Sequence, residues 1–443
     1  MAQIEVSILE YENLVIGDDW THAIQTAIDD VFSLGGGVVS IPVGTYNHKG
    51  IALKTMTVLR GKGNRSSVLK NTGTNSSITI DAEEEIVIES LNILGNNAGA
   101  GEHGITLNGS SNAFISIKST RINLHGGNGI YGGHGGHINN LLISGCIILS
   151  NGLDGINLQY GVGQINAIWI EHNDVSWNKR NGVVFFGNNI IVESNTMQAN
   201  GIYGVSVGDS SLKTAFCFGS KILNNYTEQN GYSLIENASV IGVFSGAVTG
   251  ESDNKIIRQL TIANNFFAES GAKYNSIIHC IDLKNSNASN KNNVLITKNN
   301  YGNKRLITLN KDTAISHDSI IEETEYVLID NLIETLPRYV KVITNQLKTR
   351  IQLEVEIGWG VTIFPQYYVD TSNRVLHLMG NVSNGSGLIA TIPVYYAPVH
   401  DMKIPVITST NEVSVIGIYT NGGIHLESGN NVQVRLDGIS YFF

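Results

Sequence analysis

The strongest constraint on the fold is an eight-residue apolar segment that recurs along the chain with a polar residue at a fixed place. In IWIEHNDV (168–175) and IIVESNTM (190–197), Ile or Val at the third position is followed three residues later by Asn. A second apolar run opens with Gly nine residues after that Asn in both repeats. The interval between repeats varies between about 22 and 40 residues. This spacing indicates a repeat array, in which each unit packs on its neighbours.

The two short strands of each repeat cannot bury their apolar face alone. Stacked in parallel, equivalent strands of successive repeats would lie about 4.8 Å apart and form a solenoid. The polar residues at the fixed place would then stack inside one turn, where each amide bonds the backbone or the next amide. The sequence therefore predicts a parallel β-helix with an internal ladder of Asn173, Asn195, Asn225, Asn265 and Asn299.

Composition narrows the possible partners and the compartment. The chain has 443 residues, of which 15% are charged, and a net charge of −10. This balance argues against a nucleic-acid partner, whose phosphates require clustered Lys and Arg. No apolar run approaches the roughly 18 residues of a membrane span. The three cysteines form no CxxC motif and the first residues lack signal-peptide features, so we expect synthesis in a reducing cytoplasm.

Residues 17–46 differ from the repeats and predict a helix followed by a strand. Apolar residues recur at helical spacing, Asp18 or Asp19 can cap the start, and Gly35–Gly37 end the helix. A helix here would cover the open end of the solenoid. The stretch resembles the N-terminal signature of the pectate-lyase-like superfamily, and within it the phage tailspikes and related polysaccharide depolymerases.

This resemblance covers about residues 10–310 and implies an all-β chain built on a right-handed parallel β-helix. We expect residues 1–50 to form the N-terminal strand and capping helix, and residues 51–315 to form the β-helix. Residues 316–360 break the repeat and predict a connector. Residues 361–443 alternate like a small antiparallel β-sandwich domain with Gly and Asn turns.

The C-terminal segment resembles C-terminal domains of tail-fibre and baseplate proteins from phages of Gram-positive bacteria. The matching pieces are Leu376–Val382, IATIPVYYAP and the closing LDGISY. The resemblance implies a homotrimer whose sandwich trimerises or binds the host, in a virion tail made without a signal peptide. Its partners would be the phage tail or baseplate and a bacterial surface polysaccharide or teichoic acid.

One candidate catalytic set lies on the outward face of the first strand of each repeat. Glu171 and Glu193 occupy equivalent places in adjacent coils, beside Asp174. Adjacent coils hold side chains about 5 Å apart and coils two apart about 10 Å, so the fold offers the carboxyl separations of both retaining and inverting glycosidases. Repulsion between two such carboxylates favours protonation of one and allows a general acid. The alternative is a solvated strand face.

A second set surrounds the residue before the Gly that opens the second strand. Asp154 holds that place in NGLDGINL, which is similar to the first catalytic motif of the polygalacturonases with Asn157 replacing its second aspartate. The next coil has Arg180-Asn181 where that family has two aspartates, so its mechanism is not implied. Asp154 could also be a turn-forming residue. The residues expected to bind substrate are Glu102, His103, His125, Asn128, Tyr131, Asn157, Lys179 and Arg180, with Phe186 and Tyr203 as outward aromatic platforms.

Three functions are compatible with these residues. A tailspike hydrolase would cleave a surface polymer with Asp154 and Glu171 or Glu193 as acid and base. A glycan lyase would use His103 or Lys179 as the base and a cation, often Ca²⁺, to neutralise a uronate. A non-catalytic receptor-binding protein would only hold the glycan. We expect hydrolysis and no cofactor.

The glycine-rich stretch 125–137 raises the question of a metal site. His134 and His137 lie three residues apart in it, but no carboxylate or Cys completes a ligand set at metal-binding spacing. We therefore expect no metal there and a loop that lines the site instead.

Overall fold

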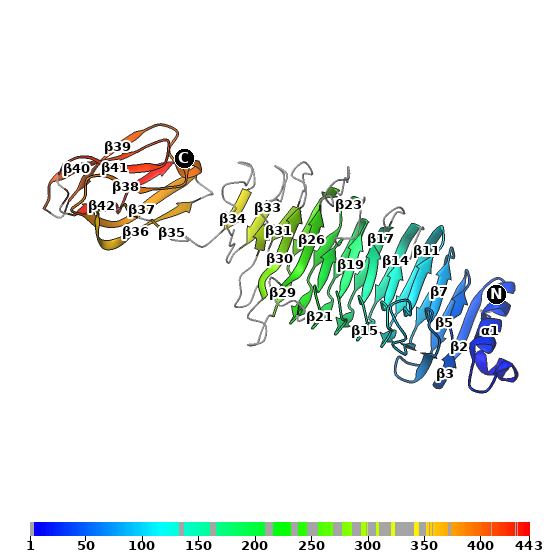
Figure 1. Ribbon diagram of the computed structural model, residues 1–443. Coiled ribbons are helices and arrows are strands. Elements are labelled where there is room, and N and C mark those ends of the chain that lie inside the picture. Colours follow the sequence, from blue (N-terminus) through cyan, green and yellow to red (C-terminus); the bar gives the residue numbers. More distant parts are fainter. Residues whose placement is uncertain are drawn as a thin grey trace, which may run out of the picture. The chain divides into compact units, whose positions relative to one another are not determined.

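The computed structural model divides into two compact units, Met1–Val340 and Lys341–Phe443 (Figure 1). No helix in the described part of the chain is long and apolar enough to cross a membrane. Much of the expected connector, 316–360, lies outside the described residues. The structure describes residues 4–132, 137–159, 165–208, 216–231, 238–245, 256–268, 277–285, 294–297, 299, 307–309, 320–323 and 341–344, and residues 351–443 except 354, 357, 371–373, 409, 430 and 432.

The first unit consists of three parallel sheets, to which successive coils of the chain contribute strands in turn (Figure 1). Sheet A contains β1 (Glu5–Ser7), β2 (Gly37–Ile41), β5 (Thr57–Gly61), β8 (Val87–Glu89), β11 (Ser111–Lys118), β14 (His137–Ser144), β17 (Ile165–Glu171), β20 (Asn188–Glu193), β24 (Lys221–Leu223), β28 (Leu260–Ala263), β31 (Val294–Thr297) and β33 (Ile320–Glu323). Sheet B contains β3 (Gly44–His48), β6 (Ser67–Asn71), β9 (Asn92–Leu94), β12 (Arg121–Asn123), β15 (Ile147–Leu149), β18 (Asp174–Ser176), β21 (Thr196–Gln198), β25 (Tyr226–Glu228) and β29 (Phe266–Phe267).

Sheet C completes each coil before the chain returns to sheet A. It contains β4 (Ile51–Leu53), β7 (Ile78–Asp81), β10 (Ile105–Asn108), β13 (Ile130–Gly132), β16 (Ile156–Gln159), β19 (Val183–Phe186), β22 (Val205–Val207), β26 (Ala238–Ser245), β30 (Ile277–Asn285) and β32 (Ile307–Leu309). A separate pair joins β23 (Phe216–Phe218) to β27 (Ile256–Arg258).

Stacked aliphatic side chains fill the space between the three sheets. Ile143, Ile170 and Val192 stand at equivalent places of β14, β17 and β20 and are fully buried. Because side chains alternate along a strand, the residues between them face outward. The repeated Ile and Val of the sequence therefore form one continuous core, and the predicted parallel β-helix is confirmed.

The turn from sheet A to sheet B combines a residue in the left-handed region with a buried Asn. His172 has a φ of 55°, a conformation that costs a non-glycine residue roughly 1–3 kcal/mol. Asn173 stabilises the turn because its backbone N–H and its amide both donate to Oδ1 of Asn195 over 2.9 Å. The same bonds continue through Asn225, Asn265 and Asn299. This confirms the predicted ladder, called here the Asn173 ladder.

A second amide ladder, which our sequence analysis missed, lines the turn from sheet B to sheet C. Asn178 donates from its backbone and its amide to Oδ1 of Asn200 over 3.2 and 3.0 Å. Its members stand five residues after the corresponding places of the first ladder, and this spacing could have revealed them. We call Asn151, Asn178, Asn200 and Asn230 the Asn178 ladder.

The predicted capping helix closes the N-terminal end of the coils (Figure 1). Helix α1 (Thr21–Ser33), which follows the 3₁₀ helix η1 (Ile8–Leu14), buries Ile24 and Ile28 against the first strands. The N-cap residue is Trp20, and Asp19, one residue before it, accepts hydrogen bonds from the backbone and hydroxyl of Thr21 over 3.0 and 2.6 Å. Gly35 and Gly36, with φ of 88° and 100°, end the helix.

The second unit contains two antiparallel sheets, as the alternation of the C-terminal segment predicts. One sheet contains β35 (Ile351–Gln352), β36 (Gly360–Asp370), β37 (Val375–Ser383), β42 (Val434–Arg435) and β43 (Ser440–Phe442). The other contains β38 (Gly387–Thr391), β39 (Met402–Ile407), β40 (Val413–Ile418) and β41 (Gly423–Ser428), and the 3₁₀ helix η3 (Val394–Tyr396) follows β38. Strand β34 (Lys341–Thr344) precedes them in the chain.

Candidate functional site

A third ladder runs along the turn residues that come immediately before sheet C, and it contains four of the predicted site residues, among them Asp154. Each side chain accepts a hydrogen bond from the backbone N–H of the equivalent residue one coil later. The bonds join Nδ1 of His103 to Asn128, Oδ1 of Asn128 to Asp154, Oδ1 of Asp154 to Asn181, and Oδ1 of Asn181 to Tyr203, over 2.9–3.2 Å. We call these five residues the Asp154 ladder.

Asp154 is the ionisable carboxyl in this ladder, and it is fully buried. Its Oδ1 accepts from the backbone and the amide of Asn181 over 3.0 and 2.8 Å, and its Oδ2 accepts from the amide of Asn157 over 2.7 Å. Nε of Arg180 lies 3.7 Å from Oδ1. Burial raises the pKa of Asp154, although the charge of Arg180 and these hydrogen bonds oppose the shift. The carboxyl is therefore more easily protonated than an exposed aspartate.

His103 stands two coils before Asp154 and is held as a neutral ring. It stacks on Tyr131 with 4.5 Å between the ring centres. Burial, together with the charge of His125, lowers the pKa of His103 to about 4. Because Nδ1 accepts the Asn128 backbone N–H, the ring proton lies on Nε2. His103 can therefore donate a hydrogen bond from Nε2, but its Nδ1 is already occupied.

The outward face of sheet C beside this ladder is largely buried. Asn157, Val184 and Ser206 hold successive outward places and are 6%, 0% and 1% exposed. Phe186, expected to be an outward platform, is 2% exposed and packs in the core, so that expectation is wrong. Tyr203 is also buried, at 6%. The exposed part of the site is cationic instead: the Arg180 side chain is 38% exposed and Lys179 is exposed.

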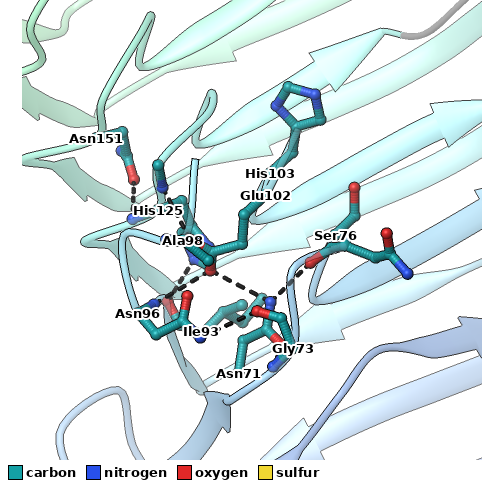
Figure 2. Close-up of polar contacts among 12 residues, drawn as sticks. Asn71, Gly73, Ser76, Ile93, Asn96, Ala98, Glu102, His103, His125 and Asn151 are labelled. Atoms are coloured by element: carbon teal, nitrogen blue, oxygen red, sulfur yellow. Dashed lines mark hydrogen bonds and ion pairs between the residues drawn. The ribbon is translucent and has the colours of Figure 1, made fainter. Parts of the chain in front are cut away.

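Glu102 and His125 do not face outward, contrary to the expectation that they bind substrate. Both are fully buried and lie 3.1 Å apart, Oε1 to Nδ1 (Figure 2). The remaining lone pairs of Glu102 accept hydrogen bonds from within the fold. The pair is therefore internal, and any effect on a ligand passes through residues that it positions.

The outward acids of sheet A lie on a different edge of the coil from Asp154. Glu171 and Glu193 are direct neighbours at the ends of β17 and β20, as predicted. Asp174 is exposed at the start of β18 and accepts a hydrogen bond from Ser176. In the chain order of each coil, a strand of sheet B follows the place of Glu171 or Glu193 and precedes the Asp154 ladder, and Asp174 lies in that sheet. Asp154 bonds Asn157 and Asn181, whereas Glu171 and Glu193 bond Ser144 and Asn224, so the described contacts do not pair Asp154 with either glutamate.

No three His, Cys, Asp or Glu side chains gather into a metal-binding group among the residues that the structure describes. His134 lies outside those residues. The expectations of no metal in the loop 125–137 and of Ca²⁺ in a lyase both remain predictions.

Comparisons with known proteins bear on the fold. Residues 103–236 match the family described as right handed beta helix region. None of the curated proteins matches the chain. The match agrees with the three parallel sheets of the structure and with the right-handed parallel β-helix fold that the sequence predicts.

Solved structures with similar folds include phage and bacterial proteins at low identity. The Dettilon tailspike protein is 14% identical over 97% of this chain and 93% of its own, with a TM-score of 0.47. The enzymatically active domain of tailspike protein 2 of bacteriophage CBA120 is 14% identical over 99% and 70%, with a TM-score of 0.47. The A-module of the Azotobacter vinelandii mannuronan C-5 epimerase AlgE4 is 17% identical over 69% and 98%, with a TM-score of 0.42. These likenesses concern the fold alone.

Proposed function

We propose that the β-helix binds a bacterial surface polysaccharide or teichoic acid at the Asp154 ladder and cleaves it there. The observation that supports this is a carboxyl at a ladder place where adjacent coils have Asn. The ladder needs one acceptor oxygen at this place, which Asn128 and Asn181 supply without an ionisable group. A buried carboxyl is harder to accommodate than an amide. Proton transfer explains why the chain has one here.

The surrounding groups suit a sugar ligand. With its raised pKa, Asp154 can retain a proton and donate it to a glycosidic oxygen. Oδ1 of Asn157 is buried without a hydrogen-bond partner among the described residues, so an unsatisfied acceptor lies beside the carboxyl. Arg180 adds a cation that favours an anionic chain.

Hydrolysis is our first expectation and elimination the second. A lyase base must have a free nitrogen or amine, and Nδ1 of His103 already accepts the Asn128 N–H. Lys179 remains as the base for elimination. The complete burial of Asp154 favours a further alternative, in which the protein binds the glycan without cleaving it.

Incubation of the purified chain with capsular and cell-wall polymers, read for reducing ends and for unsaturated products, separates these functions. Reducing ends alone indicate hydrolysis, unsaturated products indicate elimination, and binding without products indicates a receptor-binding protein. Asp154→Asn keeps the acceptor oxygen of the ladder, as Asn128 and Asn181 do, and should lower the cleavage rate roughly 10²–10⁴-fold while the protein stays folded. A variant that cleaves like the wild type would remove Asp154 from the mechanism.

The place of the chain in a virion is also a proposal. The phage-like C-terminal segment supports a homotrimeric tail or baseplate component that acts at the bacterial surface. Light scattering of the full chain tests the trimer directly, because a monomer mass at micromolar concentration would contradict it.

A further inference from the structure

Glu102 takes the place of a missing ladder side chain. In the Asn178 ladder, an amide oxygen accepts both the backbone N–H and the amide of the residue one coil earlier. Asn96 stands at the corresponding turn, but its own amide bonds the Gly73 carbonyl instead. Oε1 of Glu102 accepts from the Asn71 amide and from the Asn96 backbone, each over 3.2 Å. A carboxylate from the following loop therefore supplies the acceptor that this coil lacks (Figure 2).

The other oxygen of Glu102 closes the loop that contains it. Oε2 accepts from the backbone N–H of Ala98 over 3.1 Å and of Gly126 over 2.9 Å. Donors thus surround both oxygens, and an amide could accept on only one of its two terminal atoms. Burial alone would raise the pKa of Glu102, but the hydrogen bonds from His125 and the backbone outweigh it and lower the pKa. Glu102 is therefore an ionised carboxylate.

His125 faces an acceptor at each ring nitrogen. Nδ1 lies 3.1 Å from Oε1 of Glu102, and Nε2 lies 3.2 Å from the carbonyl oxygen of Ile93. A neutral imidazole has one N–H and can donate to only one of them. The carbonyl cannot donate, and the carboxylate is ionised, so both ring nitrogens must bear protons. A neutral ring would donate to one of the two buried acceptors and turn a lone pair toward the other.

The position of the His103 side chain depends on the Glu102–His125 contact because His103 directly follows Glu102 in the chain. Figure 2 shows its ring pointing away from the cluster, toward the opposite side of the loop. Three titratable residues interact electrostatically with His125: Glu102, His103 and His48. Burial is the main reason why the pKa of both other histidines is lowered to about 4, and the charge of His125 adds to the shift. A cationic His125 therefore strengthens the preference of the neighbouring rings for the neutral form.

We infer that Glu102 and a doubly protonated His125 form a buried ion pair that positions His103 and keeps it neutral at the candidate site. At this coil, the pair takes the place of one neutral amide of the Asn178 ladder with two opposite charges. His125 and Glu102 are positioning residues, since neither reaches the surface. A role of this pair in cleavage rests on the proposed function. The charge state of the pair and its effect on the pKa of His103 do not depend on that function.

The test uses the full chain with ¹⁵N-labelled histidine, and His125→Asn assigns the His125 signals by their absence. In the wild type near pH 7 we expect protons on both ring nitrogens of His125, and in Glu102→Gln on one only. His125→Asn leaves a buried carboxylate without its cation and should lower the melting temperature by about 4–7 °C. The Glu102→Gln/His125→Asn double variant should lose less than the sum of the single losses.

His103 provides a readout that a merely structural pair would not change. Its titration midpoint, near pH 4 in the wild type, should rise in His125→Asn because the cation is gone and Glu102 remains. A singly protonated His125 in the wild type, or additive melting losses, would overturn the ion pair. An unshifted His103 in a folded His125→Asn variant would overturn its effect on the site. If the polymer panel gives neither products nor binding, only the proposed function fails.

Discussion

The Asn173 ladder and the Asp154 ladder are built on the same principle and differ in their chemistry. In both, a side-chain oxygen accepts the backbone N–H of an equivalent residue in an adjacent coil. The Asn173 ladder uses Asn at five successive places, and the amides also bond one another. The Asp154 ladder includes a histidine, an aspartate and a tyrosine among its five residues.

The comparison shows how a repeat protein separates structure from function. A neutral amide satisfies a donor and an acceptor at every turn, so identical rungs are sufficient for stability. Ionisable groups at equivalent places are harder to bury and contribute no additional backbone bond. Where they replace amides along one ladder, beside Arg180 and Tyr131, they mark the part of the coil at which we propose that a ligand binds. The predictions below test that separation.

The largest loss of stability is expected when a carboxyl is introduced into the Asn173 ladder. In Asn195→Asp, an oxygen would replace the amide nitrogen that donates to the Ile170 carbonyl and to Oδ1 of Asn225. Two acceptors would then face a buried carboxylate, and the free energy of unfolding should fall by roughly 3–5 kcal/mol. Urea denaturation near pH 7 measures this loss.

Asp154→Asn is the matched control because it makes the reverse chemical change at the corresponding place of the other ladder. It should leave the unfolding midpoint unchanged or raise it, since Oδ1 of the new amide accepts the Asn181 hydrogen bonds and its nitrogen can donate to Oδ1 of Asn157 once that amide turns over. If Asn195→Asp loses less than about 1 kcal/mol, the amide ladder tolerates charge, and the argument for a special role of Asp154 fails.

A smaller loss is expected when the space for the His103 ring is filled. An added Cβ at Gly127 would clash with Nδ1 of His103 and lie 2.6 Å from the carbonyl oxygen of Ala100. Gly127→Ala should therefore displace the ring and lower stability by roughly 1–3 kcal/mol, which thermal unfolding and the His103 resonances can report. Gly101→Ala is the control in the same loop, because no atom lies within 4 Å of its added Cβ. Equal losses in both variants would contradict a specific contact with His103.

The stability of the folded chain should depend on pH through Asp154. The pKa of Asp154 is raised in the folded chain above its ordinary value of 3.8. The folded state therefore holds this proton more tightly than the unfolded state, and the associated stability is lost as pH rises through the raised value. Asp154→Asn lacks this loss. Its melting temperature relative to the wild type should thus increase as the pH rises above the ordinary value of 3.8, and a constant difference would show that burial of the charge does not matter.

The sequence was sufficient for the architecture because the repeat encodes it locally. Ile and Val at every second place define the strands, and one Asn per coil defines the first turn. The same periodicity predicted that Asp154, Asn128 and His103 share one edge of the coil. These predictions needed only the alignment of equivalent places in successive coils, and the repeated sequence pattern supplies that alignment.

Burial and hydrogen-bond partners depend on what packs against each place, and the repeat does not encode that. Phe186 stands at an outward position by alternation, yet it is buried. Glu102 comes from an irregular loop between two regular coils, so no spacing indicated that it would pair with His125 inside the fold. An alignment of repeats shows which residues occupy equivalent places in successive coils. It does not show how far apart different places of a coil lie, so it could not test the pairing of Asp154 with Glu171.

The smallest effects are expected on sheet A. Glu171 accepts a weak hydrogen bond of 3.4 Å from Ser144, and Glu193 accepts one of 2.9 Å from Asn224, at half-buried places. Glu171→Gln and Glu193→Gln keep an acceptor oxygen and remove one of two adjacent like charges, so stability should change by less than about 0.5 kcal/mol. On any polymer that the wild type cleaves, both variants should keep its rate. If either variant abolishes cleavage while Asp154→Asn does not, the catalytic groups lie on sheet A, and the charged rungs of the Asp154 ladder need another explanation.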